Sequence, residues 1–297
     1  MSDPLFIPIV YNIRYGIISA MKGFTLLLAA IFIYPIALFA QGDLQKMVDT
    51  EHAFAQAAAT NGTRAAFLEF MANDAVVFNP DITNAKAFWT ARATSPSLLS
   101  WAPNFADMSS NGILGYTTGN WEYRAKGKDD APTAFGDFIT LWLRQPDGKY
   151  KWVVDIGVSH DKPEKYSTDW VTRVAATDKN GSEPTREAMT EFYQMAEKQG
   201  LTKAYKEFAA DDIRSYREGK LPFIGKKASL NAVGSEKGTY RFGNRSTTFT
   251  AGDISYNLNT YTKSIDKKEV EKGNFLQIWK FYGGSWHMVL DIFKPLQ

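Results

Sequence analysis

The chain has 297 residues, enough for two domains of ordinary size, and its 44% hydrophobic and 14% aromatic content is ample for packed cores. Its formal net charge of +2 is too small for the dominant basic surface of a nucleic-acid-binding protein. With no cysteine and three histidines, the chain has no disulfide or thiolate metal site, and a histidine-rich metal site is not expected. We therefore expect neither a nucleic-acid partner nor a metal.

The first forty residues have the layout of a secretory signal. We expect Met21 to be the working start. The positive charge of Lys22 then precedes an uncharged run over residues 23–40, and polar residues follow. Residues 1–20 would then be an upstream extension, with cleavage near Ala40. A membrane anchor is the alternative, because the run is long enough to span a bilayer. We favour cleavage because Pro35 breaks the helix where the peptidase needs an extended segment, and we expect an exported protein, periplasmic or extracellular, that has left the membrane.

Residues 41–162 show a helical region followed by a long meander of strands. Helices are expected at 43–59, 63–71 and 84–92, a short strand at 75–78, a loop carrying Trp101 and Pro103, and further strands at 105–109, 113–123, 136–142 and 150–156. The last two strands are joined through a tight turn at Asp147-Gly148. This order predicts an α+β domain whose helices cover one face of a curved, mostly antiparallel sheet.

Residues 163–182 are expected to form a linker, after which residues 183–297 repeat the same order. Helices are expected at 186–198 and 202–210, a short helix entrance near 219–228, and strands at 211–213, 238–242, 247–250, 254–261 and in a final hairpin at 273–292. The segment 208–212 follows 70–74 at an offset of 138 residues, and in both hairpins the turn glycine precedes an aspartate by seven positions. Because element order and turn spacing recur together, they predict a tandem duplication.

The repeated segments resemble nuclear transport factor 2-like domains. The resemblance is carried by Gly115–Tyr123, by the two hairpins, and by the segment from Gly219 through Pro222 to Gly225. The chain is similar to a tandem of such domains, which share a fold with SnoaL-like polyketide cyclases and ketosteroid isomerase, and in particular to an exported bacterial branch of unknown function. The resemblance implies two cone-shaped domains, at 41–162 and 183–297, each with about three N-terminal helices packed on a strongly curved sheet around an apolar pocket.

The same resemblance implies that two chains could form a homodimer through the exposed face of the sheet. It carries over no reaction, because the matching residues are mostly glycines and core aromatics, and a shared fold does not fix a function. The sequence also contains no phosphate-binding glycine loop and no Gly-x-Ser-x-Gly or His-Glu-x-x-His motif, so no cofactor is expected.

Asp155 and Asp291 are the most suggestive site residues, because each ends an apolar strand. A carboxylate there is costly unless it is hydrogen-bonded or protonated, and a raised pKa would suit a general acid or base. The alternative is that each aspartate pins its sheet through backbone, tryptophan or tyrosine partners, and its presence in both halves favours this. His52 on the first helix could pair with Asp155, although an exposed helix surface is the favoured interpretation.

The remaining candidates are ligand-binding residues. They are Asn79, Asp81, Trp89, Trp101, Tyr123 and Trp142 in the first domain, and Tyr193, His287 and Asp291 in the second, with His287 expected on the same strand face as Asp291. His160 is expected in a solvated loop, and Asp137 and Asn274 at strand entrances. We expect the protein to bind a small, largely apolar molecule in a cone pocket. The alternatives are a cofactor-independent isomerase, cyclase or dehydratase working in the first domain, and a non-catalytic scaffold for partners.

Overall fold

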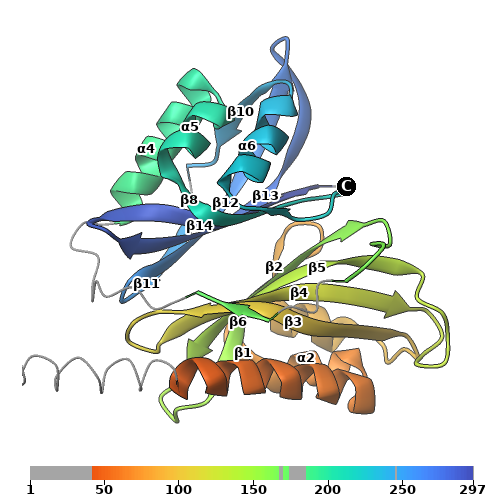
Figure 1. The fold of residues 1–297 in the computed structure, drawn as a ribbon. Helices are drawn as coiled ribbons and strands as arrows, with labels where there is room; N and C mark the ends of the chain where they lie inside the picture. Colours follow the sequence, from red (N-terminus) through yellow and green to blue (C-terminus); the bar gives the residue numbers. More distant parts are fainter. Residues whose placement is uncertain (1–41, 167–169, 174–184, 245, 297) are drawn as a thin grey trace, which may run out of the picture.

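The computed structural model describes residues 42–166, 170–173, 185–244 and 246–296, and the expected signal segment lies outside them. Two mixed sheets of seven strands each pack face to face, and helices cover the opposite face of each sheet (Figure 1). The predicted α+β class is confirmed. Residues 42–70 and 185–208 supply the helices that precede each sheet, so each half consists of helices followed by a meander of strands.

The first half follows the predicted order of elements. A helix at 42–61 precedes α2 (Thr63–Phe70), β1 (Met71–Phe78), β2 (Ile82–Asn84), α3 (Ala85–Ala91), β3 (Leu98–Met108), β4 (Leu114–Arg124), β5 (Ala134–Arg144), β6 (Tyr150–His160) and β7 (Val171–Thr172). The sheet order is β2-β1-β6-β5-β4-β3-β7, with β1 parallel to β6. The prediction of a loop around Trp101 and Pro103 is wrong. Both residues lie in β3, where a register shift after Pro103 accommodates a residue that cannot donate to the ladder.

The second half repeats this arrangement. Its elements are α4 (Thr185–Gln199), α5 (Leu201–Phe208), β8 (Ala209–Arg217), β9 (Phe223–Ile224), α6 (Lys226–Ser235), β10 (Thr239–Phe242), β11 (Thr247–Ala251), β12 (Ile254–Ile265), β13 (Lys268–Tyr282) and β14 (Ser285–Pro295). Its sheet order is β10-β12-β13-β14-β8-β9, and β11 pairs with β12. As in the first half, the strand after the helices runs parallel to the last strand.

The two sheets share a register shift between the first strand after the helices and the last strand. In the first sheet Met71 pairs with Trp152, and after a register shift Val77 pairs with Asp155. In the second sheet Ala209 pairs with Met288, and after a matching shift Ser215 pairs with Asp291. These pairs differ by 138 residues on one strand and 136 on the other. The matching register fits the tandem duplication expected from the sequence.

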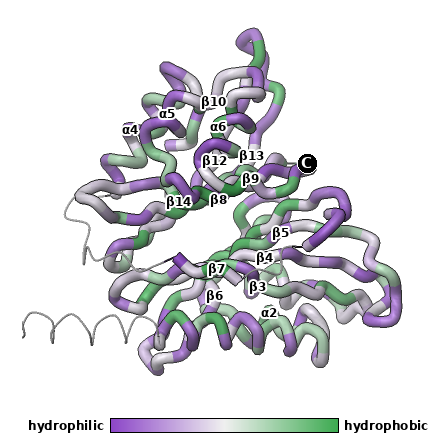
Figure 2. Tube along the Cα trace, viewed as in Figure 1, coloured by the Kyte–Doolittle hydropathy of each residue, from purple (hydrophilic) through white to green (hydrophobic). Residues whose placement is uncertain are grey.

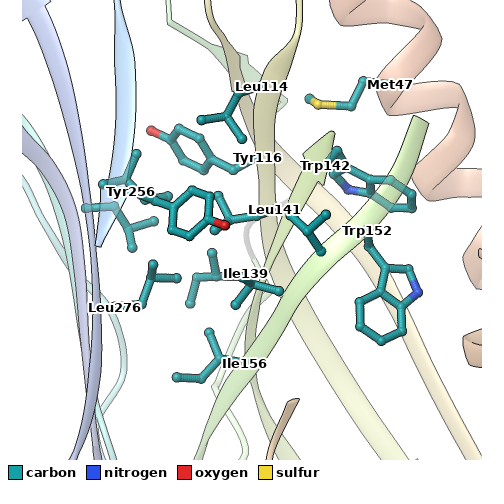
Figure 3. Close-up of a cluster of buried hydrophobic side chains, with 14 of the residues drawn as sticks. Met47, Leu114, Tyr116, Ile139, Leu141, Trp142, Trp152, Ile156, Tyr256 and Leu276 are labelled. Atoms are coloured by element: carbon teal, nitrogen blue, oxygen red, sulfur yellow. The ribbon is translucent and has the colours of Figure 1, made fainter. Parts of the chain in front are cut away.

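The faces of the two sheets that are turned toward each other form a buried apolar layer, which we call the inter-sheet layer. Figure 3 shows Tyr116, Ile139 and Ile156 of the first sheet directed toward Tyr256 and Leu276 of the second. Figure 2 shows hydrophobic stretches along β14 and β8, where the sheets meet, and hydrophilic residues on many of the outlying loops. The sheet face suggested for a homodimer is therefore covered within one chain, so an association of two chains would need another surface.

Candidate functional site

A cavity of about 300 Å³ lies in the first half, between helices α2 and α3 and the helix-covered face of the first sheet. This volume is at the lower end of ordinary small-ligand pockets. Its walls are mainly aromatic, contributed by Phe67, Phe88, Trp89, Trp101, Trp121 and Phe138. The ionisable side chains among its lining residues are Arg92, Asp155 and Lys294. The cavity is therefore suited to an apolar body with few polar groups.

Asp155 lies on β6 with its side chain half-buried at the cavity wall. The hydroxyl of Thr140 on β5 donates a hydrogen bond to Asp155 Oδ2 over 2.8 Å. Burial raises the pKa of Asp155 from an ordinary 3.8 to about 7, the Thr140 bond acts to lower it, and the negative charge of Glu51 raises it further. Asp155 is therefore present in both protonation states near neutral pH, so it can either donate or accept a hydrogen bond.

Glu51 is a buried carboxylate that the sequence reasoning missed. It lies on the 42–61 helix, and its side chain accepts bonds from Trp101 Nε1 at 2.6 Å, Thr117 Oγ1 at 2.5 Å and Trp142 Nε1 at 3.0 Å. Burial raises the pKa of Glu51, while these three hydrogen bonds act to lower it. Since Trp101 lines the cavity, Glu51 fixes one of the cavity walls. The signal was available in the sequence: Glu51 follows Met47 by four residues, on the apolar face of the helix.

Two cations lie at the cavity, and neither was predicted. Arg92 follows α3, and its guanidinium stacks 4.2 Å from the ring centroid of Phe88 and 5.5 Å from that of Trp89. Lys294 reaches over from β14 of the second half, and its Nζ donates to the Gly157 carbonyl at 2.8 Å and to Glu218 at 3.2 Å. Lys294 is 137 residues from Gly157 in the chain, so no local pattern could have placed it here.

Four predicted residues of the first half meet at the cavity, namely Asn79, Trp89, Trp101 and Asp155. The other four lie elsewhere. His52 is exposed, because one step along a helix turns it about 100° away from buried Glu51, so it does not pair with Asp155. Asp81 is exposed in a turn, where its carboxylate accepts from the Ile82 amide. Tyr123 is 37% exposed beside a neighbouring hollow, and Trp142 is fully buried behind the cavity wall.

The second half places a different environment around the equivalent aspartate. Asp291 is fully buried and accepts bonds from Arg217 Nη1 at 2.9 Å and from the Tyr205 hydroxyl. Arg217 holds the position that Asn79 holds in the first half, 138 residues earlier. This aspartate therefore pins the sheet, which is the structural alternative considered for both. The adjoining hollow, of about 690 Å³, is lined by charged groups such as Lys263 and Glu236.

The remaining second-half candidates are not at that hollow. The Tyr193 hydroxyl donates to Asn257 Oδ1 over 2.5 Å, and its ring stacks on Phe242. His287 stacks on Tyr282, with ring centroids 4.2 Å apart. The prediction that His287 shares a face with Asp291 is wrong, because the register shift between Met288 and Leu290 reverses the alternation of side chains between them.

His160 was also mispredicted. It ends β6 with a buried side chain, and its Nε2 lies 2.9 Å from Asp137 Oδ2. Asn120 Nδ2 donates to the other oxygen of Asp137 over 2.8 Å. The three residues form a polar cluster on the face of the sheet opposite the cavity. Asn274, the counterpart of Asp137, is also buried.

Within the described ranges, no helix is long and apolar enough to cross a membrane. Among the same residues, no group of three or more histidine, aspartate or glutamate side chains is arranged to hold a metal ion.

No protein-family model and no curated protein matches the sequence. Among solved structures, the chain is similar to an NTF2-like protein of unknown function from Pseudomonas putida KT2440, with 18% identity over 37% of this chain and 82% of the other, at a TM-score of 0.33. It is also similar to an NTF2-like protein with a cystatin-like fold from Novosphingobium aromaticivorans, with 14% identity over 39% and 82% of the two chains and a TM-score of 0.34. A third is a proposed ketosteroid isomerase from Parabacteroides distasonis ATCC 8503, with 11% identity over 40% and 96% and a TM-score of 0.35.

Each of these structures covers less than half of this chain. The two mixed sheets, each with its own helical cover, are consistent with two cone-like NTF2-like units. The similarities concern the fold and assign no ligand or reaction to the chain.

Proposed function

We propose that the first half, expected as a domain at residues 41–162, binds a small, largely apolar molecule in the cavity beside Asp155. The observation that carries the proposal is an aromatic-walled cavity of about 300 Å³ with one carboxyl group on its wall. Aromatic walls favour a flat apolar body, while a few fixed polar groups set its orientation. The export signal expected in the first forty residues would place this binding outside the cytoplasm.

The cavity favours a binder over the scaffold alternative, because a scaffold would gain stability from a filled cone. The second half offers no equivalent, since its aspartate is already paired with Arg217.

Titration calorimetry with 2-naphthol, a neutral ring system bearing one hydroxyl, tests the proposal. We expect saturable one-site binding to the full chain. A Trp89→Leu variant should bind about fivefold or more weakly, since it loses ring contact at the wall. Trp170→Leu is the matched control, because Trp170 is 44% exposed and lies outside the cavity. A folded wild-type protein that takes up no 2-naphthol, or equal loss in both variants, would count against the site.

A second candidate function is proton transfer, favoured by the pKa of about 7 for Asp155. The Asp155 carboxylate would remove a proton from the carbon next to a ligand carbonyl and return it to the same or a neighbouring carbon, with no cofactor required. Deuterium incorporation into 1-tetralone, followed by NMR, tests this. We expect wild type to exceed the buffer rate and Asp155→Asn to match the buffer rate. If wild type binds 1-tetralone but does not accelerate deuterium incorporation, the binding proposal stands and the enzymatic candidate is rejected.

A further inference from the structure

We propose that the ligand of the first-half cavity carries a carboxylate or a similar anion, which Arg92 binds at the rim while the apolar body fills the aromatic interior. This inference rests on the proposed function, and it adds the chemical class of the ligand and the residue that selects it.

Arg92 is an exposed cation whose position is fixed but whose charge is uncompensated. Its guanidinium lies 4.2 Å above the Phe88 ring and 5.5 Å from the Trp89 ring, and no carboxylate among the described residues forms an ion pair with it. Stacking holds the plane of a guanidinium and leaves its N–H edge available. Such an edge matches the two oxygens of a carboxylate.

The neighbouring Arg64, by contrast, has a structural role at the end of α3. Its Nε donates to the Trp89 carbonyl at 2.9 Å and its Nη2 to the Thr90 carbonyl at 3.3 Å, so it satisfies the end of α3. Arg92, from the same corner of the fold, is not needed for that purpose. Its N–H groups therefore remain available to a ligand.

Lys294 does not compete with Arg92 for the role. Its Nζ is shared between the Gly157 carbonyl and the Glu218 carboxylate, and its side chain is 22% exposed. The Glu218 charge largely compensates Lys294, which leaves Arg92 as the uncompensated positive charge among the ionisable groups at the cavity. Asp155, the remaining ionisable group, lies further along β6.

The spacing of these groups sets the shape of the ligand. Asp155 and Gly157, where Lys294 is anchored, are two residues apart on β6, which corresponds to about 7 Å along a strand. The cavity lining thus combines one half-buried carboxyl group, aromatic walls and two cations, of which Arg92 is exposed. A ring system that carries both an anion and a hydroxyl or carbonyl matches that set of groups.

The experiment compares 6-hydroxy-2-naphthoate with its methyl ester and with 2-naphthol, by calorimetry on the full chain. We expect the carboxylate to bind about tenfold more tightly than the ester, with the difference shrinking as salt increases. Arg92→Gln should bring the carboxylate and ester affinities, compared within that variant, to within about twofold of each other. Arg241→Gln is the matched control, because Arg241 is an exposed residue of β10 in the other half and should change nothing.

Thermal unfolding of each variant checks that both arginine substitutions leave the fold intact. If 2-naphthol binds and the carboxylate gains nothing over the ester, the anion inference is overturned while the proposed function stands. If Arg92→Gln retains the full carboxylate preference, the assignment to Arg92 is overturned. If none of the three probes binds, both the inference and the proposed function fail.

Discussion

Lys280 of β13 donates to Asp107 of β3 over 2.5 Å, and both side chains are buried between the two sheets. Lys280 Nζ also reaches the Met108 carbonyl at 3.2 Å and lies 3.9 Å from Asp253 Oδ2. One buried ion pair therefore joins the halves at the edge of the apolar inter-sheet layer. A buried pair adds little net stability, but removal of one partner leaves a charge without compensation.

We predict that Lys280→Ala lowers the free energy of unfolding by about 3 kcal/mol, because Asp107 then keeps the Met108 amide but Arg173 as its one charged partner among the described residues, with Arg173 Nε 3.4 Å away. Urea denaturation measures this. The control is Lys268→Ala, an exposed position on the same strand, expected within about 0.5 kcal/mol of wild type. The paired change Lys280→Met with Asp107→Leu should recover only part of the loss, because buried Asp253 and Arg173 each lose a charged partner. Equal effects of the two lysine substitutions would show that the buried pair is unimportant.

The raised pKa of Asp155 predicts that the free energy of unfolding decreases as pH rises. Between about pH 4 and pH 7 the unfolded chain ionises this carboxyl while the folded chain keeps its proton, so the native state binds more protons and loses stability as pH rises. Above about pH 7 the loss is complete. Relative to Asp155→Asn, wild type should become less stable by a few kcal/mol between pH 4.5 and 7.5. Urea titrations at several pH values measure the difference, and parallel profiles for the two proteins would contradict the prediction.

Glu51→Gln should destabilise the first half and disturb the cavity. Each Glu51 oxygen accepts a bond from an indole or hydroxyl donor, and an amide group would present N–H toward at least one of these donors. We expect a loss of about 1–3 kcal/mol and weaker 2-naphthol binding, through displacement of Trp101. His52→Gln, one residue later and exposed, should leave both measurements unchanged. If His52→Gln reduced binding as strongly, the geometry assigned to this helix would be incorrect.

Arg217→Met should test the structural role of Asp291. The substitution leaves a fully buried carboxylate with only the Tyr205 hydroxyl among its present side-chain donors, so we expect a loss of about 3–5 kcal/mol in the free energy of unfolding. Because this site lies in the other half, 2-naphthol affinity of the folded fraction should be unchanged. Arg241→Met serves as the control on an exposed strand position.

The sequence was sufficient for the architecture because its evidence was local and repeated. The helix and strand patterns, the glycine turns and the 138-residue offset each depend on neighbours in the chain, and the order of elements follows from them. Asp155 was found for the same reason, as a carboxylate in an apolar strand, although β6 does not end there as expected and continues to His160. Asn79, Trp89 and Trp101 also proved to line one cavity with it.

The failures have equally specific causes. One extra residue between Met288 and Leu290 reversed the face of His287, and a register shift of this kind has no reliable sequence signature. His160 was expected in a solvated loop because the last strand was expected to end at residue 156. That strand, β6, continues to His160, which contacts Asp137 of the preceding strand. Lys294 arrives from the other half, so only tertiary structure could place it. Glu51 could have been found from its helical spacing to Met47, which favours the buried face.

The inter-sheet layer has a consequence for how the two halves can differ. Had two identical chains met through this face, every substitution would appear on both sides of the symmetry axis, and a lysine facing an aspartate would require both on each copy. Covalent linkage supplies the partner surface at a local concentration that does not depend on dilution. A substitution in one half can therefore occur without the same substitution in the other. Lys280 lies opposite Asp107 across the layer, and the halves differ in having an aromatic-walled cavity in one and a charged hollow in the other.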